Sequence, residues 1–277
     1  MKLLVTLSRS LALACMVGLM AASSALAQPA KDYQPKVGQE GKDVIWVPTP
    51  QALVDKMLDM AKVTPQDYVV DLGSGDGRTV ITAAKRGAKA LGIEYNPDMV
   101  ELSKGNAAKE GVGEKAKFVK ADIFETDFSE ATVVTLFLLP SLNVKLRPKL
   151  LEMKPGTRVV SNSFDMGDWT PDETAEGVEG CTSYCRALFW IVPAKVAGTW
   201  QNPQGELKLE QTFQMVSGTL KSGNVIAPLA NGKLAGDRIT FTAGDTQYTG
   251  KVSGNAIEGA SATGGKEAPW RATRTGK

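Results

Sequence analysis

The hydrophobic pattern of residues 67–164 alternates between short apolar runs and longer amphipathic stretches. The apolar runs, each typical of a buried strand, cover residues 67–72, 90–94, 117–121, 131–138 and 157–164. Stretches with helical spacing lie between them, over residues 77–87, 97–109 and 140–153. One run, 131–138, is continuous and rich in β-branched residues, as is typical of a strand covered on both faces. The alternation predicts a doubly wound, mostly parallel α/β sheet.

The segments that flank this region are expected to add one helix and one strand. Residues 44–47 are apolar, and Pro50 suits the first turn of a helix that Thr49 would cap. Residues 187–192 form a last apolar run, which we expect as an antiparallel strand at the edge of the same sheet. Together these segments predict a Rossmann-like α/β domain over residues 44–196.

A second domain, over residues 197–277, is expected to contain only strands. Apolar residues alternate with polar ones there, and the sequence of residues 232–236 resembles that of residues 250–254. Asn-Gly and Ser-Gly pairs supply the turn signals of hairpins. The pattern predicts a small antiparallel β domain, either a sandwich or a barrel, with Trp200 and Trp270 closing its ends.

The first 27 residues have the pattern of a secretory signal peptide. Their start is basic, an apolar run follows over residues 11–22, and residues 25–27 form a small-x-small cleavage pattern. The run is too short for a comfortable membrane span. We therefore expect cleavage after Ala27, export to the periplasm, a mobile leader over residues 28–43 and no stable membrane span after cleavage. An uncleaved membrane tether is the alternative.

Composition narrows the chemistry of this 277-residue chain, which is 43% hydrophobic and has ample material for a core. It contains no histidine, which excludes Ser-His-Asp and Cys-His hydrolases. Only Cys181 and Cys185 remain after cleavage, so no metal site is expected, and a disulfide and two free thiols are both open. Losing Lys2 and Arg9 lowers the net charge from +2 to 0, so no nucleic-acid partner is expected.

A glycine-rich turn follows the first apolar run and reads Asp71-Leu72-Gly73-Ser74-Gly75-Asp76-Gly77. A dinucleotide fingerprint would read G-x-G-x-x-G and hold a pyrophosphate at the start of a helix. Here the spacing is G-x-G-x-G, and the carboxylates of Asp71 and Asp76 would repel a pyrophosphate. They suit a cationic ligand that carries an ammonium and a sulfonium. The loop resembles motif I of the class I S-adenosylmethionine (SAM) methyltransferases, which implies SAM as the cofactor.

Side chains at the ends of the predicted strands are expected to surround this cofactor, because doubly wound sheets bind ligands there. Asp71 would organise the loop and attract the ammonium of SAM. Glu94 would accept the ribose hydroxyls, and Asp122 would accept from the adenine amino group. The predicted cofactor-binding residues are Asp71, Gly73, Ser74, Gly75, Gly77, Glu94, Asp122, Ile123 and Thr49.

A wider resemblance covers roughly residues 44–193. The stretches at 46–50 (Trp-Val-Pro-Thr-Pro), 92–94 (Gly-Ile-Glu) and 133–140 (Val-Val-Thr-Leu-Phe-Leu-Leu-Pro) are similar to one methyltransferase group. That group includes the lysine methyltransferases of the ATP synthase c-subunit and of the adenine nucleotide translocase, with bacterial relatives. The resemblance implies methyl transfer by direct displacement to a protein side chain, lysine among them, or to a small molecule. The Asn/Asp-Pro-Pro-Tyr motif of many amino-group methyltransferases is absent, because Leu-Leu-Pro-Ser stands in its place.

The sequence does not identify the group that removes the acceptor's proton. Asp127 and Asp165 are candidates because they follow the third and fifth predicted strands, and solvated loop acids are the alternative. A second hypothesis treats the chain as an exported non-enzymatic binding protein whose β domain contacts the partner. It rests on the signal peptide, since SAM is a cytosolic metabolite. The oligomeric state is not predicted.

Overall fold

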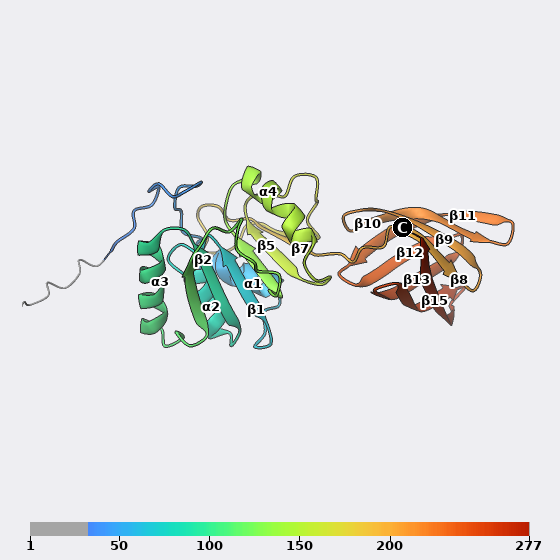
Figure 1. Ribbon diagram of the computed structural model, residues 1–277, viewed down its shortest axis with the longest axis horizontal. Helices are drawn as coiled ribbons and strands as arrows, with labels where there is room; N and C mark the ends of the chain where they lie inside the picture. The colour runs from blue at the N-terminus through green and yellow to red at the C-terminus, as the bar shows by residue number, and fades with distance from the viewer. Residues whose placement is uncertain (1–32, 277) are drawn as a thin grey trace, which may run out of the picture. The chain divides into compact units, whose positions relative to one another are not determined.

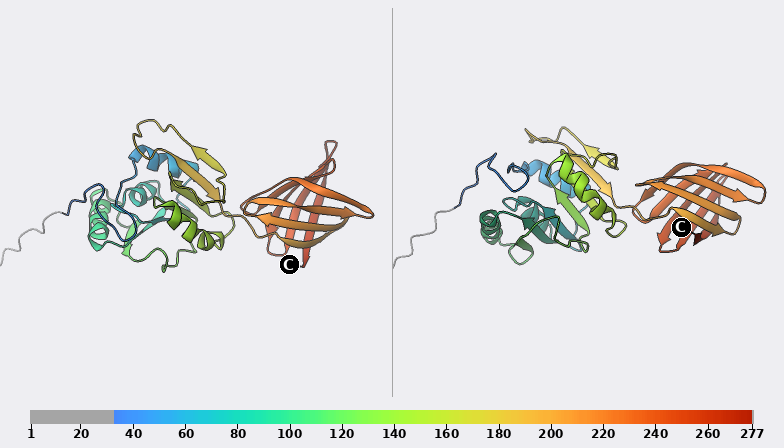
Figure 2. Two further views of the ribbon diagram at one scale, coloured as in Figure 1. Left: turned by 90° about the horizontal axis from the view of Figure 1, so that it is seen from above. Right: turned by 45° about the horizontal axis from the view of Figure 1, so that its top comes forward.

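The computed structural model describes residues 33–276 (Figure 1). The predicted signal peptide, its cleavage site and the first residues of the predicted leader lie outside the described residues. Within the described range the chain forms a seven-stranded sheet with helices on both faces and a closed eight-stranded barrel. Figure 2 shows both from two further directions.

The centre of the sheet is built from the five predicted parallel strands. These are β1 (Tyr68–Leu72), β2 (Lys89–Glu94), β3 (Ala116–Lys120), β4 (Val133–Leu136) and β5 (Arg158–Asn162). Their spatial order is β3-β2-β1-β4-β5, with Asp71 paired with Gly92 on one side and with Thr135 on the other. The chain thus winds outward from β1 in both directions, and doubly wound sheets bind ligands at such a switch point. The predicted α/β fold is confirmed.

Helices cover both faces of the sheet, because successive side chains of a strand point to opposite faces. The helices are α1 (Gln51–Met60), α2 (Arg78–Lys85), α3 (Pro97–Lys109) and α4 (Pro140–Leu151). Val69 and Val133 pack in one core with α1, α2 and α3, whereas Val70 and Val134 pack in a second core with α4. Within residues 33–276, no helix reaches the length and hydropathy that crossing a bilayer requires.

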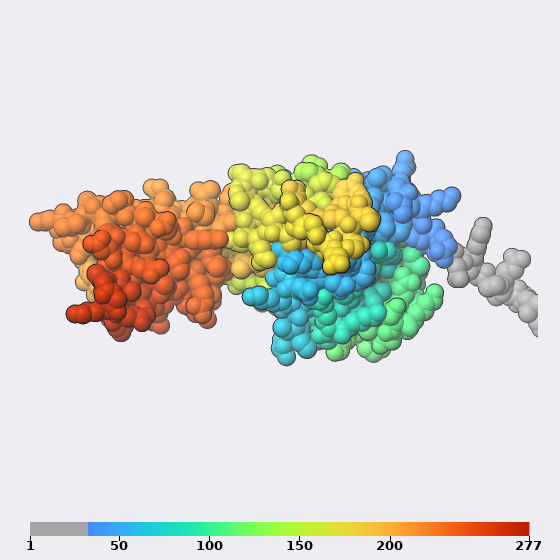
Figure 3. Space-filling model, turned by 180° about the vertical axis from the view of Figure 1, so that it is seen from behind, coloured from blue at the N-terminus to red at the C-terminus, as the bar shows by residue number. Residues whose placement is uncertain are grey.

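The sheet ends in two antiparallel strands. β7 (Ala187–Ile191) pairs with β5, and its antiparallel direction is as predicted, but its expected place at the edge is wrong. The short β6 (Glu173–Ala175) pairs with the outer side of β7. The segment around β6, yellow in Figure 3, lies against α1, where Val178 and Cys181 pack on the first core. The sequence pattern missed β6 because three residues that begin with a charged side chain carry no apolar signal.

A disulfide joins Cys181 to Cys185, which is one of the two alternatives that the sequence left open. The Cα atoms are 5.6 Å apart, within the range that a disulfide allows, because the intervening residues turn. Tyr184 has a φ of +53° in this turn. The disulfide therefore closes a tight loop, called here the disulfide loop (residues 181–185), immediately before β7.

The C-terminal segment forms a closed antiparallel barrel, so the barrel and not the sandwich is the observed fold. Its strands are β8 (Gly198–Asn202), β9 (Gly205–Thr212), β10 (Met215–Ser222), β11 (Val225–Ala235), β12 (Arg238–Ala243), β13 (Thr246–Ser253), β14 (Ala256–Thr263) and β15 (Lys266–Gly276). Pairing of β15 with β8 closes the ring and removes free edges. Trp200 and Trp270, which were expected at its ends, are both buried in the barrel core.

Candidate active site

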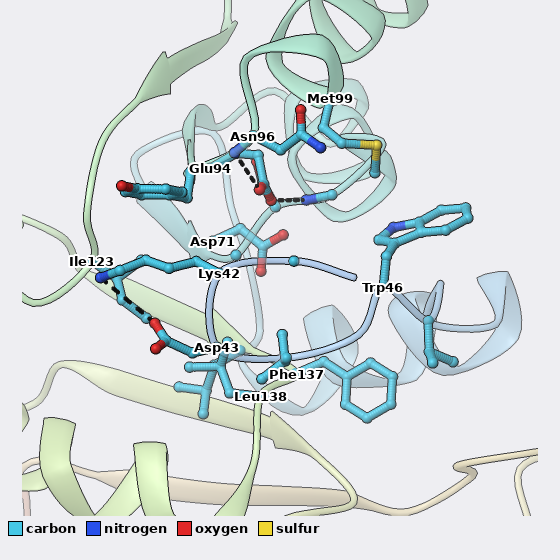
Figure 4. A pocket seen from close by; sticks show the side chains of 18 of the residues that line it. Lys42, Asp43, Trp46, Asp71, Glu94, Asn96, Met99, Ile123, Phe137 and Leu138 are labelled. Carbon is cyan, nitrogen blue, oxygen red and sulfur yellow. Dashed lines mark hydrogen bonds and ion pairs between the residues drawn. The ribbon is translucent and has the colours of Figure 1, made fainter. Parts of the chain in front are cut away.

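A cavity of about 430 Å³ opens at the carboxyl ends of the parallel strands (Figure 4). The ends of β1 to β4 line it, together with the glycine loop (residues 73–77) and the segment 39–49 that precedes α1. Phe164 and Tyr184 extend the lining beyond the end of β5. The lining joins charged strand ends to an apolar wall, so it fits a ligand that is polar in one part and apolar in another.

The glycine loop turns on backbone angles that other residues rarely adopt. Gly73, Gly75 and Gly77 have φ values of +78°, +54° and +84°, in the left-handed region where a Cβ causes strain. Space is a second constraint. A Cβ on Gly75 would lie 2.6 Å from Nε1 of Trp46, and one on Gly77 would lie 2.8 Å from the ring of Phe118. Gly73 and Gly75 therefore leave the cavity wall free of side chains, whereas Gly77 allows close packing against Phe118 and does not line the cavity.

Glu94, at the end of β2, holds the glycine loop in place. Its two carboxylate oxygens accept hydrogen bonds from the N–H groups of Gly75 and Asn96, each at 2.9 Å. Each oxygen keeps a further lone pair, so the carboxylate can also accept from a ligand. Ser74 is buried, and its hydroxyl has no hydrogen-bond partner among the described residues. A buried, unpaired hydroxyl at the cavity fits a polar group of a bound molecule.

Asp71 lies at the floor of the cavity and is only 7% exposed. The hydroxyl of Thr135 on β4 donates to its carboxyl at 2.6 Å. Burial raises the pKa of Asp71 to about 7, against the lowering effect of the Thr135 hydrogen bond, and the nearby charge of Glu94 adds to the rise. A carboxyl that is costly to ionise in the free protein attracts a cationic group, because a positive charge offsets the cost of burial.

Asp122, after β3, is engaged by a residue that sequence reasoning did not single out. Lys42 forms an ion pair with its carboxylate, and the Lys42 ammonium lies 5.0 Å from the centre of the Tyr95 ring. The hydrogen bond from Lys42 holds the pKa of Asp122 below its usual range, and the N–H of Phe124 at 2.9 Å adds to this effect. Ile123 lines the same part of the cavity. A ligand that reaches Asp122 must therefore share it with Lys42.

Lys42 belongs to a segment that we call the strap (residues 38–47). The N–H of Gly38 donates to the carbonyl of Trp46, and the N–H of Trp46 donates to the carbonyl of Gln39, both at 2.8 Å. Sequence analysis placed most of the strap in a mobile leader, whereas in the structure its backbone is paired and it lines the cavity. The first part of the strap, residues 38–43, is polar and has no hydrophobic periodicity, so only its contacts with the strand ends could reveal its position.

Thr49 lines the cavity, but its predicted role as a helix cap is wrong. Pro50 occupies the N-cap position of α1, and no side chain caps the helix there. The Thr49 hydroxyl instead accepts a hydrogen bond from the amide of Asn162, at the end of β5, at 3.2 Å. The carbonyl of Thr49 accepts from the guanidinium of Arg78 at 2.9 Å. Thr49 therefore ties the entrance of α1 to β5 and to the start of α2.

The two acids considered for proton removal lie outside the cavity lining. Asp127 is exposed and accepts the N–H of Ser129 at 2.9 Å. Asp165 is exposed and accepts the N–H of Gly167 at 3.1 Å. Both therefore act as turn-forming side chains in the described structure. The lining at the ends of β4 and β5 is apolar instead and consists of Leu136, Phe137, Leu138, Leu139, Leu142 and Phe164.

Comparison with known proteins identifies the family of this chain. The model of the ANTKMT methyltransferase domain matches residues 71–173. A protein-lysine N-methyltransferase of Saccharolobus islandicus is 47% identical over 151 residues, which are 53% of this chain and 94% of that protein. The chain belongs to this methyltransferase family. It is a SAM-dependent methyltransferase, and SAM is its cofactor.

Other relatives extend the comparison to the same half of the chain. The lysine N-methyltransferase of the ATP synthase c-subunit from Homo sapiens is 36% identical over 146 residues, and this chain spans 62% of its length. A crystal structure described as an RNA methyltransferase from Salinibacter ruber, in complex with S-adenosyl-L-homocysteine, is 50% identical. It covers 54% of this chain and 96% of its own, with a TM-score of 0.51.

Asp71 generates a prediction about pH. Between about pH 4 and pH 7 the folded methyltransferase keeps a proton on Asp71 that the unfolded chain has lost, so its free energy of unfolding falls as the pH rises through this window. In urea unfolding of the ligand-free protein, we expect the wild type to lose about 2 to 3 kcal/mol relative to Asp71→Asn between pH 5 and pH 8.

Asp127→Asn is the matched control, because the pKa of Asp127 is lowered by its hydrogen bonds to Ser129 and it titrates below this window. It should follow the wild type between pH 5 and pH 8. Parallel curves for the wild type and Asp71→Asn would contradict a raised pKa at Asp71.

Gly75 generates a second prediction. Gly75→Ala should weaken binding of S-adenosyl-L-homocysteine by about tenfold or more, because a left-handed alanine is strained and its Cβ displaces the Trp46 ring. Gly105→Ala is the control, since a Cβ there meets nothing within 4 Å and alanine favours helix α3. Isothermal titration calorimetry measures both, and equal affinities would show that the loop tolerates a side chain.

Proposed function

We propose that this methyltransferase transfers the methyl group of SAM by direct displacement to the amine of a lysine in a protein acceptor, and that it does so outside the cytosol. The observation that carries the proposal is the division of the cavity. Its β1–β3 side presents the acids Asp71, Glu94 and Asp122, whereas its β4–β5 side is apolar. A charged cofactor fits the first side, and the stem of an uncharged amine fits the second.

The strand ends suggest how the cofactor would be held. Asp71 would attract the ammonium of SAM, and the glycine loop would admit its methionine part. Glu94 keeps lone pairs for the ribose hydroxyls after its bonds to the loop. Asp122 and Ile123 would contact the adenine, with the Lys42 ammonium beside them. The buried hydroxyl of Ser74 supports this placement, since it lacks a partner among the described residues.

Displacement from a sulfonium requires mainly that nitrogen, carbon and sulfur lie in line, so the protein contributes by positioning and by excluding water. Among the described lining residues, none at the ends of β4 and β5 is an acid. A lysine that enters this apolar end loses its hydration, and desolvation lowers the pKa of an amine. Its proton would therefore pass to solvent on entry.

The relatives support a lysine acceptor, because several are described as lysine N-methyltransferases, of proteins in general or of the ATP synthase c-subunit. The Salinibacter ruber structure, described as an RNA methyltransferase, raises RNA as the other acceptor class. The sequence after cleavage would carry no net charge, which disfavours binding to a phosphate backbone. We therefore favour protein over RNA.

Methyl transfer is tested by incubating the purified protein with isotope-labelled SAM and separate pools of envelope protein and RNA. We expect label in protein only, on lysine, with mass gains of ~14 Da per methyl group in mass spectrometry. The Gly75→Arg variant should give no label, because its side chain fills the cofactor path. Label in RNA alone would show that the acceptor is RNA and not protein. Absence of both label and SAM binding would favour the non-enzymatic binding protein.

Export is supported by the signal-like pattern of residues 1–27 and by the disulfide between Cys181 and Cys185, since disulfides persist in oxidising compartments. Residues 1–40 fused to a reporter that is active only outside the cytosol should give activity. The mature N-terminus of the full-length protein should begin at Gln28. An inactive reporter would contradict export, and an active reporter with an uncleaved N-terminus would indicate the membrane tether.

A further inference from the structure

Three aromatic side chains meet at the apolar end of the cavity. Phe137 follows β4, Phe164 follows β5, and Tyr184 lies in the disulfide loop. Their ring centroids are 5.2 to 6.2 Å apart in all three pairs, and all three residues line the cavity. Figure 4 shows Phe137 beside Leu138 at this end. Because Tyr184 is 44% exposed, the aromatic trio lies where the cavity meets solvent.

The backbone that carries the trio is held in unusual conformations. Ser163, immediately before Phe164, has a φ of +60°, and Tyr184 itself has a φ of +53°. Such non-glycine conformations cost of order 1–3 kcal/mol and persist where surrounding contacts impose them. Here the N–H of Ser163 donates to the carbonyl of Arg186 at 2.7 Å, and the Arg186 guanidinium donates back to the carbonyl of Ser163 at 2.6 Å. The disulfide fixes the other side of Tyr184.

The trio lies at the opposite end of the row of strands from the acids that would hold the nucleoside. The order β3-β2-β1-β4-β5 places Asp122 and Glu94 on one side of β1, and Phe137 and Phe164 on the other. A SAM molecule with its adenosine at the first side and its ammonium at Asp71 would direct its methyl group toward β4. This step rests on the proposed function.

We propose that Phe137, Phe164 and Tyr184 form the acceptor slot and select a lysine side chain through the positive charge of its methylated product. Aromatic faces attract an ammonium within about 6 Å and need no N–H donor, so they continue to bind as methyl groups replace the hydrogens. A carboxylate or a phosphate has the wrong sign for these faces. The slot thus takes the place of the carbonyl acceptors of the absent Asn/Asp-Pro-Pro-Tyr motif.

The reaction balances within this slot. The lone pair of the neutral lysine nitrogen forms the new N–C bond while the C–S bond breaks and its electron pair returns to sulfur. The products are S-adenosylhomocysteine and a methylammonium, which loses a proton only before a further methylation. Positive charge moves from sulfur to nitrogen during the step, and nitrogen acquires it beside the aromatic trio.

The test uses two probes on protein saturated with S-adenosyl-L-homocysteine. One is Nα-acetyl-Nε-trimethyllysine methylamide, and the other is its neutral isostere, in which a tert-butyl group replaces the trimethylammonium. Calorimetry or ligand-observed NMR should show that the cationic probe binds about 2- to 30-fold more tightly than the isostere, which is the range of a cation–π contact. Equal binding of the two probes would overturn the slot.

Variants of Tyr184 sharpen the result. Tyr184→Ala should weaken binding of the cationic probe by a similar factor and leave the affinity for S-adenosyl-L-homocysteine unchanged. Tyr184→Phe should keep the wild-type affinity for both ligands. The double variant Cys181→Ser, Cys185→Ser should resemble Tyr184→Ala. The slot is refuted if Tyr184→Ala binds the cationic probe as tightly as the wild type does. It is also refuted if the variant no longer binds S-adenosyl-L-homocysteine, since Tyr184 would then contact the cofactor and not the acceptor.

The same experiments separate the two proposals. A wild type that transfers methyl groups to lysine but does not distinguish the two probes leaves the proposed function intact and removes only the slot. If the wild type does not bind S-adenosyl-L-homocysteine, both the proposed function and the slot are refuted. Transfer of label from SAM to poly-L-lysine should fall in Tyr184→Ala through a lower kcat as well as a higher KM, because the variant loses a contact that strengthens as the acceptor nitrogen becomes charged.

Discussion

The active site depends on the carboxylate of Glu94. One oxygen accepts the N–H of Gly75 and holds the left-handed glycine loop, and the other accepts the N–H of Asn96. Asn96 in turn caps α3 by accepting from the N–H of Asp98. A single side chain at the end of β2 thus fixes the loop after β1 and the start of α3. Charge-assisted hydrogen bonds suit this task because they are shorter and stronger than neutral ones.

The cavity of this methyltransferase is electrostatically divided, and the division follows from which side chains the strands deliver. Acids lie at the ends of β1 and β2 and directly after β3, and burial raises the pKa of Asp71 to about 7. Lys42 of the strap offsets part of the charge at Asp122. Apolar and aromatic residues follow β4 and β5. The cavity therefore joins a charged region to an apolar one.

Two segments of the site lie outside the part of the chain that matches the family model, which spans residues 71–173. The strap (residues 38–47) brings Lys42 and Trp46 to the cavity, and the disulfide loop brings Tyr184 to its apolar end. The matched region thus supplies the central strands, while both entrances are built from flanking segments. Loops carried on a rigid scaffold are the usual means by which one fold serves different acceptors.

The sequence by itself determined the alternating sheet, the glycine loop and the acids at three strand ends, because each depends on local periodicity, backbone angles or position at the end of a strand. Only the tertiary structure decided the rest. Asp127 and Asp165 follow the right strands but lie outside the cavity lining, Thr49 bonds to Asn162 instead of capping α1, and Lys42 reaches Asp122 across 80 residues. The aromatic trio joins three distant segments. Such contacts leave no periodic signal, since they depend on how loops return across the sheet.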